Sequence, residues 1–273
     1  MSRSPKPYFI GFLPMPTRLK WLTAPIVVLV FVLSFGAGLM IASGMRDAGT
    51  GRWEYGIDTT LTGRLITSPY PMLETAGPMP ETVLLVGVGK VGAQDWVEPL
   101  AGQIVSAKGY LIERGPWRML ELQSADDIMA EPRETAVAPP FETVAVGPAK
   151  LKGEIIDSKC FLGVMKPGEG RVHKSCAMLC VLGGMPPMLM VRDAAGARAA
   201  YLLTDESGQP VKNGVIPYIA DPIELLGVVQ RRGDIAVFAA NIASLRRLSG
   251  KELVAFGPRI AAVGDDGLCI HPG

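Results

Sequence analysis

The chain has 273 residues, a formal net charge of +1 and an aromatic content of 7%. A chain this close to neutrality lacks the positive field of a nucleic-acid-binding protein, and so few aromatic residues provide no stacking platforms for bases, so we expect no nucleic-acid partner. The 32 glycines and 23 prolines favour a fold of many short strands and turns.

Residues 21–43 form an apolar run that contains no charged side chain. About 20 apolar residues in a helix cross the hydrocarbon core of a bilayer, and the run is longer than the apolar region of a cleaved signal peptide. The cytoplasmic N-terminus, residues 1–20, carries four basic side chains and no acidic one: Arg3, Lys6, Arg18 and Lys20. By the positive-inside rule, this predicts a single-pass helix in the inner (plasma) membrane, with the lipid bilayer as partner and the following chain periplasmic or extracellular.

Beyond about residue 55 the sequence changes to short apolar runs that end at Gly or Pro, which is typical of strands. These runs occur as two similar sets, which indicates an internal repeat. The matching segments are 61–67 with 151–157, 82–87 with 200–205, and 109–115 with 227–233, and an apolar strand follows the last pair in each copy, at 119–124 and at 235–240. The third pair shares the pattern G-x4-R-G.

The order of strands and glycines in each set resembles the oligonucleotide/oligosaccharide-binding (OB) fold, a five-stranded, partly open barrel. The resemblance is one of layout and implies no function. We therefore predict a mainly β protein, in which a transmembrane helix precedes two small OB-like barrels. The predicted parts are a first β domain, a Pro-rich linker, a second β domain and a C-terminal tail, at 56–130, 131–149, 150–247 and 248–273.

The second copy contains an insertion that the first copy lacks. The distance from the first repeat glycine to the G-x4-R-G pattern is 46 residues from Gly63 to Gly109, and 74 residues from Gly153 to Gly227, a difference of 28. The extra residues coincide with a stretch rich in Cys, His and Met, whereas the first copy contains neither Cys nor His. The barrel therefore folds without this chemistry, which we expect to be an addition to the second copy.

Four side chains of the insertion form a candidate metal site: Cys160, His173, Cys176 and Cys180. The segment H-K-S-C-A-M-L-C predicts a short helix that ends at Gly183 and places its Cys and His side chains on one face. Three thiolates and an imidazole suit a closed tetrahedral zinc site, and soft sulfur ligands suit Cu(I). Copper or zinc is therefore the predicted cofactor, if there is one.

The C-x3-C spacing of Cys176 and Cys180 resembles the copper-binding motif of membrane-anchored copper chaperones and of the binuclear copper centre of cytochrome oxidase. In those families the histidine follows the cysteines, whereas His173 precedes them here, and their fold is different. The resemblance therefore adds copper as a candidate ion and carries no function over.

Disulfides are the alternative, and the sequence favours them over a metal, because an exported chain meets an oxidising compartment. His173 would then be a surface or capping residue. Cys160 with Cys176 or Cys180 would close a loop of about 16 to 20 residues, worth roughly 3 kcal/mol, and Cys269 is available for the remaining thiol. A redox-active thiol pair is a third possibility, although the motif lacks the C-x-x-C spacing of thioredoxin-like proteins.

Other motifs do not predict an enzyme. Gly87, Gly89 and Gly92 form a G-x-G-x-x-G pattern, but the segment after it is too short and too soon broken by Pro99 to be the crossover helix of a dinucleotide site. A glycine-rich turn is the expected structure. The histidines, His173 and His271, do not build a catalytic triad with any nearby serine and acid, so no catalytic residue is predicted.

Two functions remain from the sequence. The first is a non-catalytic accessory or interaction module of a membrane-associated complex, with the barrels as docking surfaces. The second is a periplasmic metal-handling protein that uses the Cys/His cluster of the second copy. The absence of an assembled acid, base and nucleophile favours the first on sequence grounds.

Overall fold

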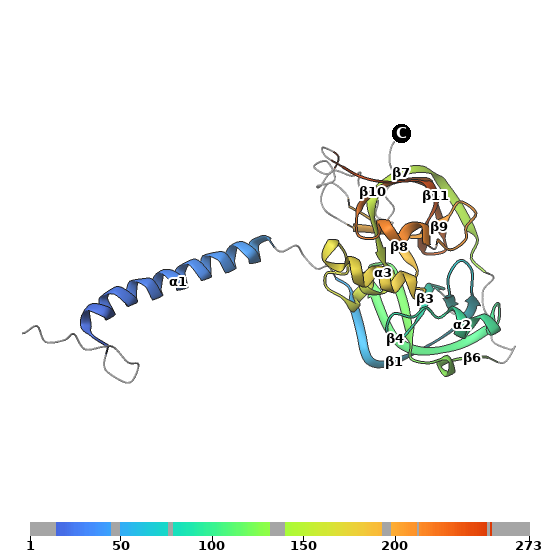
Figure 1. Cartoon of the computed structure of the whole chain (residues 1–273). Coiled ribbons are helices and arrows are strands. Elements are labelled where there is room, and N and C mark those ends of the chain that lie inside the picture. The colour runs from blue at the N-terminus through green and yellow to red at the C-terminus, as the bar shows by residue number, and fades with distance from the viewer. Residues whose placement is uncertain are drawn as a thin grey trace, which may run out of the picture. The chain divides into compact units, whose positions relative to one another are not determined.

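The structure is a computed structural model, and it describes residues 15–44, 50–75, 79–131, 140–192, 198–211, 213–249 and 252. The chain divides into an N-terminal unit, Met1–Asp47, and a larger compact unit, Ala48–Gly273. Figure 1 shows the helices and strands of both units.

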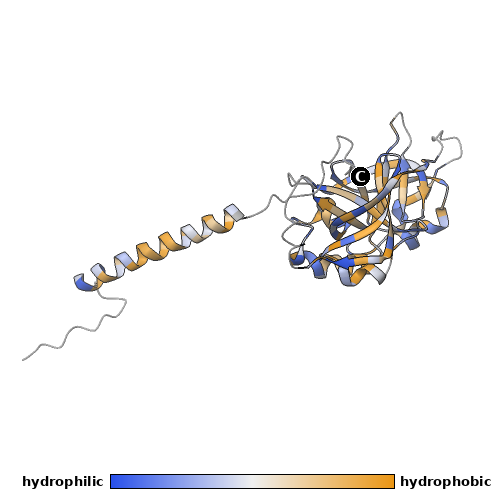
Figure 2. Cartoon of the chain, turned by 90° about the horizontal axis from the view of Figure 1, so that it is seen from above, coloured by the Kyte–Doolittle hydropathy of each residue, from blue (hydrophilic) through white to orange (hydrophobic). Residues whose placement is uncertain are grey.

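Helix α1 spans Thr17–Gly44 and, with residues 15 and 16 before it, makes up the described part of the N-terminal unit. An 18-residue window within Thr17–Ser43 has a mean hydropathy of 2.5, and none of that window is buried. Figure 2 shows apolar residues along the middle of the helix. The unbroken apolar run at 26–33 covers more than two helical turns, so apolar side chains point to every side, as expected for a helix surrounded by lipid. The helix is therefore long and apolar enough to cross a membrane.

The first sheet has six strands, of which five form a ring. The strands are β1 (Arg52–Ile66), β2 (Met72–Thr75), β3 (Thr82–Gly87), β4 (Ile104–Arg114), β5 (Trp117–Leu122) and β6 (Ile128–Ala130). The hydrogen-bonded order is β1-β2-β3-β5-β4-β6, and β1 also pairs with β4. Short helices α2 (Gln94–Val97) and η1 (Glu98–Leu100) connect β3 to β4. We call this ring barrel one.

The second sheet is a closed barrel with the order β10-β11-β9-β8-β7. Its strands are β7 (Thr143–Asp157), β8 (Pro187–Arg192), β9 (Arg198–Asp205), β10 (Pro222–Arg232) and β11 (Ile235–Arg247). We call it barrel two. Strands β3 and β5 of barrel one are parallel, as are β9 and β11 of barrel two, and the other ring pairs are antiparallel. The two barrels therefore have one topology, and the predicted mainly β fold with two OB-like barrels is confirmed.

Repeat glycines explain why the same spacing recurs in both copies. A Cβ atom on Gly63 would lie 2.3 Å from the carbonyl oxygen of Glu74, and one on Gly153 would lie 2.5 Å from that of Met190. Only glycine lets the long first strand of each barrel approach the second strand so closely. At the end of the G-x4-R-G pattern, Gly115 and Gly233 both have φ of +56°, as required at the first position of their hairpin turns.

The barrels pack against each other through corresponding strands. A buried apolar cluster joins side chains from β2, β3 and β5 to side chains from β8, β9 and β11. Polar contacts cross the same interface: the Tyr70 hydroxyl donates to the Leu203 carbonyl at 2.8 Å, and Arg232 pairs with Glu74 at 2.8 Å. Strand β7 begins at Thr143, inside the segment expected to be a linker, so the connection itself supplies strand to barrel two.

The insertion lies between β7 and β8 and holds three short helical elements: η3 (Cys160–Val164), η4 (Arg171–His173) and α3 (Lys174–Leu182). Phe161 and Leu162 are buried in the cluster between the barrels. The Arg114 guanidinium of β4 lies 4.2 Å from the centre of the Phe161 ring. A segment that belongs to barrel two by sequence is therefore packed against barrel one.

Candidate functional site

Two elements of the insertion carry its cysteines. Cys160 begins η3, directly after β7, and is buried. Cys176 and Cys180 lie one turn apart on α3, so both face the same side of this helix. The helix ends where predicted, at Gly183, whose N–H donates to the Leu179 carbonyl at 3.0 Å.

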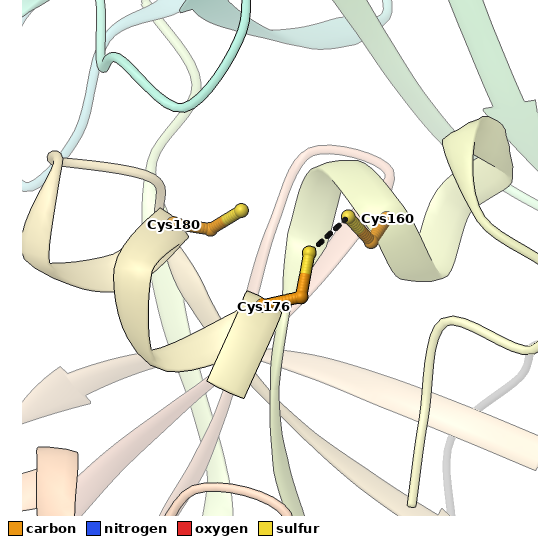
Figure 3. A group of neighbouring side chains, drawn as sticks. All are labelled: Cys160, Cys176 and Cys180. Atoms are coloured by element: carbon orange, nitrogen blue, oxygen red, sulfur yellow. Dashed lines mark hydrogen bonds between the residues drawn. The ribbon is translucent and has the colours of Figure 1, made fainter. Parts of the chain in front are cut away.

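The three thiols converge, as Figure 3 shows. Their sulfur atoms all lie within 4.8 Å of one another, and Cys160 Sγ and Cys176 Sγ are 4.0 Å apart. All three cysteines are free in the structure. We call Cys160, Cys176 and Cys180 the thiol cluster.

A lysine from barrel one forms hydrogen bonds with the thiol cluster. The Lys90 ammonium group donates to Cys176 Sγ at 2.7 Å and to Cys180 Sγ at 3.4 Å. These hydrogen bonds raise the pKa of Lys90, with the bond to Cys176 the largest cause. A cation at hydrogen-bonding distance from two sulfurs favours their thiolate forms over their thiol forms.

Lys90 belongs to the glycine-rich turn at 87–92, and this turn is fixed against the insertion on both sides. On one side the Gly92 N–H donates to the Gly183 carbonyl at 2.7 Å, and a Cβ on Gly183 would lie 1.8 Å from the Lys90 carbonyl oxygen. On the other side the Lys159 ammonium donates to the carbonyls of Gly87 and Gly89, each at 2.9 Å. The position of Lys90 above the thiols is therefore set by backbone contacts.

Lys159 is itself buried and forms an ion pair with Glu121 of β5 at 2.8 Å. This charge pair connects the residue next to Cys160 to the first barrel. Because a buried charge needs a partner and hydrogen bonds, the three contacts of the Lys159 ammonium group, with Gly87, Gly89 and Glu121, specify how the insertion meets barrel one.

The thiols differ in acidity. A hydrogen bond from Cys160, together with the nearby Lys90, lowers the pKa of Cys180 to about 7. The same hydrogen bond to Cys180, together with burial, raises the pKa of Cys160. Of these two buried thiols, Cys180 therefore reaches the thiolate form more readily than Cys160.

The structure places His173 beside an acid and not at the centre of the cysteines. His173 Nε2 lies 3.0 Å from Asp157 Oδ2, and both residues are buried. Their ligand atoms lie within 4.8 Å of Cys160 Sγ, which makes a second group, Asp157, Cys160 and His173. Asp157 Oδ1 also accepts the Cys160 N–H at 2.8 Å, so this acid orients the start of η3.

Of the four predicted ligands, three come together in the thiol cluster, and His173 reaches the edge of it through Cys160. A set of all four ligands within 4.8 Å is not found among the described residues, so the Cys3His site stays a prediction. Cys269 and His271 lie outside the described residues. The methionines Met185, Met188 and Met190 are buried in the cluster between the barrels, where they fill the core.

Sequence reasoning missed the residues that surround the cysteines. Lys90 lies in the G-x-G-x-x-G stretch, which is a turn as expected: Val86 pairs with Gly92, and helix α2 after it has four residues. Nothing in the stretch itself indicates that its lysine meets cysteines 86 and 90 residues away. Asp157 and Lys159 flank Cys160 in D-S-K-C, and this concentration of charge beside a buried cysteine was the available signal.

The candidate site thus consists of the thiol cluster, the Lys90 ammonium group and the buried pair of Asp157 and His173, at the junction of two OB-like barrels. Three soft donors with a counter-cation can hold a soft metal ion, and two of them can form a disulfide. No protein-family model, curated protein or solved structure matches this chain.

Proposed function

We propose that this protein is a membrane-anchored, metal-handling protein whose thiol cluster takes up monovalent copper on the exported side of the inner membrane. The observation that carries the proposal is the convergence of three cysteine sulfurs within 4.8 Å. Thiolates are the ligands that select Cu(I) over harder ions. The basic segment before the apolar helix supports an exported location.

The surroundings of the thiols favour a metal over a disulfide staple. A staple uses two cysteines of this cluster, and the third would then need Cys269, which lies outside the described residues. Lys90, at 2.7 Å from Cys176 Sγ, is a counter-ion for a thiolate, and a disulfide sulfur carries no charge for it to balance. The metal-handling hypothesis therefore accounts for more of the site than the staple does.

The donor set favours copper over zinc. A structural zinc site needs four ligands in a tetrahedron, whereas the thiol cluster supplies three, and a group that joins His173 to all three cysteines is not found among the described residues. A three-sulfur site matches the low coordination number and soft character of Cu(I). We therefore infer that copper is cargo bound by sulfur alone.

Copper titration of the full-length protein, purified in detergent under reducing conditions, tests the proposal. We expect one Cu(I) per chain after removal of excess metal, and loss of the ion in Cys160→Ser and in Cys180→Ser. Retention in His173→Ala would fit the three-sulfur site. Cys269→Ser is the matched control, because it removes a thiol from outside the described residues. A wild-type protein that retains no copper while all three cluster thiols are free would contradict the proposal.

The interaction-module hypothesis stays a separate prediction. Its test is purification from native membranes without added metal. A stable larger complex that persists in Cys176→Ser would support docking by the barrels and would make the thiol cluster dispensable for it.

A further inference from the structure

The three thiols differ in their access to solvent. Cys160 and Cys180 are 4% and 2% exposed, whereas Cys176 is half-buried. A molecule that approaches the thiol cluster from solvent therefore meets Cys176 first. The other two sulfurs are enclosed by the core between the barrels, since both belong to its apolar cluster.

The most accessible sulfur is also the one closest to the cation. Lys90 Nζ lies 2.7 Å from Cys176 Sγ and 3.4 Å from both the Cys176 carbonyl oxygen and Cys180 Sγ. Lys90 is exposed, while the backbone of its turn is held by Gly183 and Lys159. A fixed backbone with an exposed ammonium group keeps a positive charge at the mouth of the cluster.

We propose that Cys176 is the exchange ligand through which Cu(I) enters and leaves the site. When the Cys176 sulfur dissociates from the ion, the Lys90 ammonium group stabilises the resulting thiolate. This inference rests on the proposed copper site. It makes the protein a donor of copper to an acceptor whose ligand is itself a sulfur, a thiolate or a thioether. Cys160 and Cys180 are then the buried anchors of the ion.

The step is a ligand substitution without electron transfer. The acceptor sulfur donates an electron pair to Cu(I), and the bond between Cu(I) and Cys176 Sγ breaks with its pair remaining on sulfur. Copper stays monovalent throughout. The new thiolate charge on Cys176 forms 2.7 Å from the Lys90 ammonium group, which stabilises it. Cys160 and Cys180 release the ion afterwards to the same acceptor.

Alkylation of the copper-loaded, full-length protein tests the role of Cys176. A thiol that leaves the metal transiently is trapped by iodoacetamide, and peptide mapping by mass spectrometry assigns the modified cysteine. We expect Cys176 to be alkylated on the order of tenfold faster than Cys160 and Cys180, because it alone combines exposure with a nearby cation. Equal rates, or faster alkylation of either buried cysteine, would overturn the assignment.

Transfer of Cu(I) to dithiothreitol tests the role of Lys90. This acceptor binds Cu(I) through its two sulfurs as thiolates, and the protons of its thiols pass to the buffer. In Lys90→Gln the leaving thiolate loses its counter-ion, and we expect transfer to slow on the order of fivefold, about the effect of one unit charge at contact distance in water. Lys90→Arg keeps the charge and should restore most of the rate. Lys108→Gln removes an exposed lysine elsewhere in barrel one and is the matched control.

The two proposals fail in different ways. If wild-type protein retains no copper, the metal-handling function itself is wrong. If copper is retained at one ion per chain but Lys90→Gln transfers it as fast as wild type, only the exchange role of Lys90 is wrong. Melting curves of the copper-free variants show whether a change in rate reflects a change in folding.

Discussion

The two barrels are alike in topology and differ in one connection. In barrel one, residues 67–71 link the first two strands, whereas residues 158–186 make the same link in barrel two. Repeat glycines, hairpin turns and the parallel strand pair correspond in both. A barrel of this topology therefore folds with a short link between its first two strands. The long link of barrel two carries the thiol cluster and makes the contacts with barrel one.

The long link is nevertheless packed into the rest of the structure. It places Cys160 and Phe161 in the core between the barrels, and it receives Lys90 from the other copy. The cysteines come from one copy of the repeat and their counter-cation from the other. The thiol cluster therefore depends on the packing of both copies.

The largest effect is expected from the buried charge pair that joins the link to barrel one. Glu121 corresponds to Ala239 in the register of the two copies, so a barrel does not need a carboxylate there. Lys159→Met leaves Glu121 buried without a partner, and we expect unfolding free energy to fall by about 3–5 kcal/mol. Urea denaturation of the full-length protein in detergent measures it. Lys159→Met with Glu121→Gln should recover part of the loss, and an unchanged midpoint in the single variant would contradict the prediction.

A smaller effect is expected at the contact between α3 and the lysine turn. In Gly183→Ala the new methyl group would meet the Lys90 carbonyl oxygen, so the turn must shift, at a cost of about 1–3 kcal/mol. Gly147→Ala in β7 is the matched control, since its Cβ would meet no atom within 4 Å. Thermal melting compares the two variants. Equal melting temperatures would show that the turn and the helix are not tightly fitted.

The smallest effect concerns Glu154 of β7, which occupies the position of Arg64 in barrel one. Burial raises the pKa of Glu154, with Glu169 and Asp221 adding repulsion and Arg192 opposing it. The native state therefore holds this proton more strongly than the unfolded state, and stability is lost as the pH rises from the unfolded pKa through the native one. Glu154→Gln removes that loss, so we expect no gain at pH 4 and a gain of at most about 1 kcal/mol at pH 7.

Melting temperatures of Glu154→Gln and wild type, measured from pH 4 to pH 7, check the sign. Glu206→Gln replaces an exposed glutamate in a loop of barrel two and should show no such pH-dependent difference. A Glu154→Gln variant that loses stability relative to wild type as the pH rises would show that the carboxylate contributes favourably.

The sequence by itself determined the elements whose causes are local. An uncharged run of sufficient length predicts α1, and glycines at fixed spacings predict two barrels of one kind, because only glycine permits the close strand approach at Gly63 and Gly153. The helix of the insertion and its end at Gly183 also followed from neighbouring residues. These patterns extend over a few neighbouring residues, so they can be recognised in the amino-acid sequence alone.

Only the tertiary structure decided which of these elements meet. The shared core between the barrels, Lys90 above Cys176 and Cys180, and the pairing of His173 with Asp157 all join surfaces that the local pattern does not relate. In the sequence, a lysine in a glycine-rich turn cannot be distinguished from a solvated lysine. The packing of one barrel on the other places it beside the thiols. The chemistry of the site arises from that packing, because the energy of a cation beside a thiolate depends on their distance in space and not along the chain.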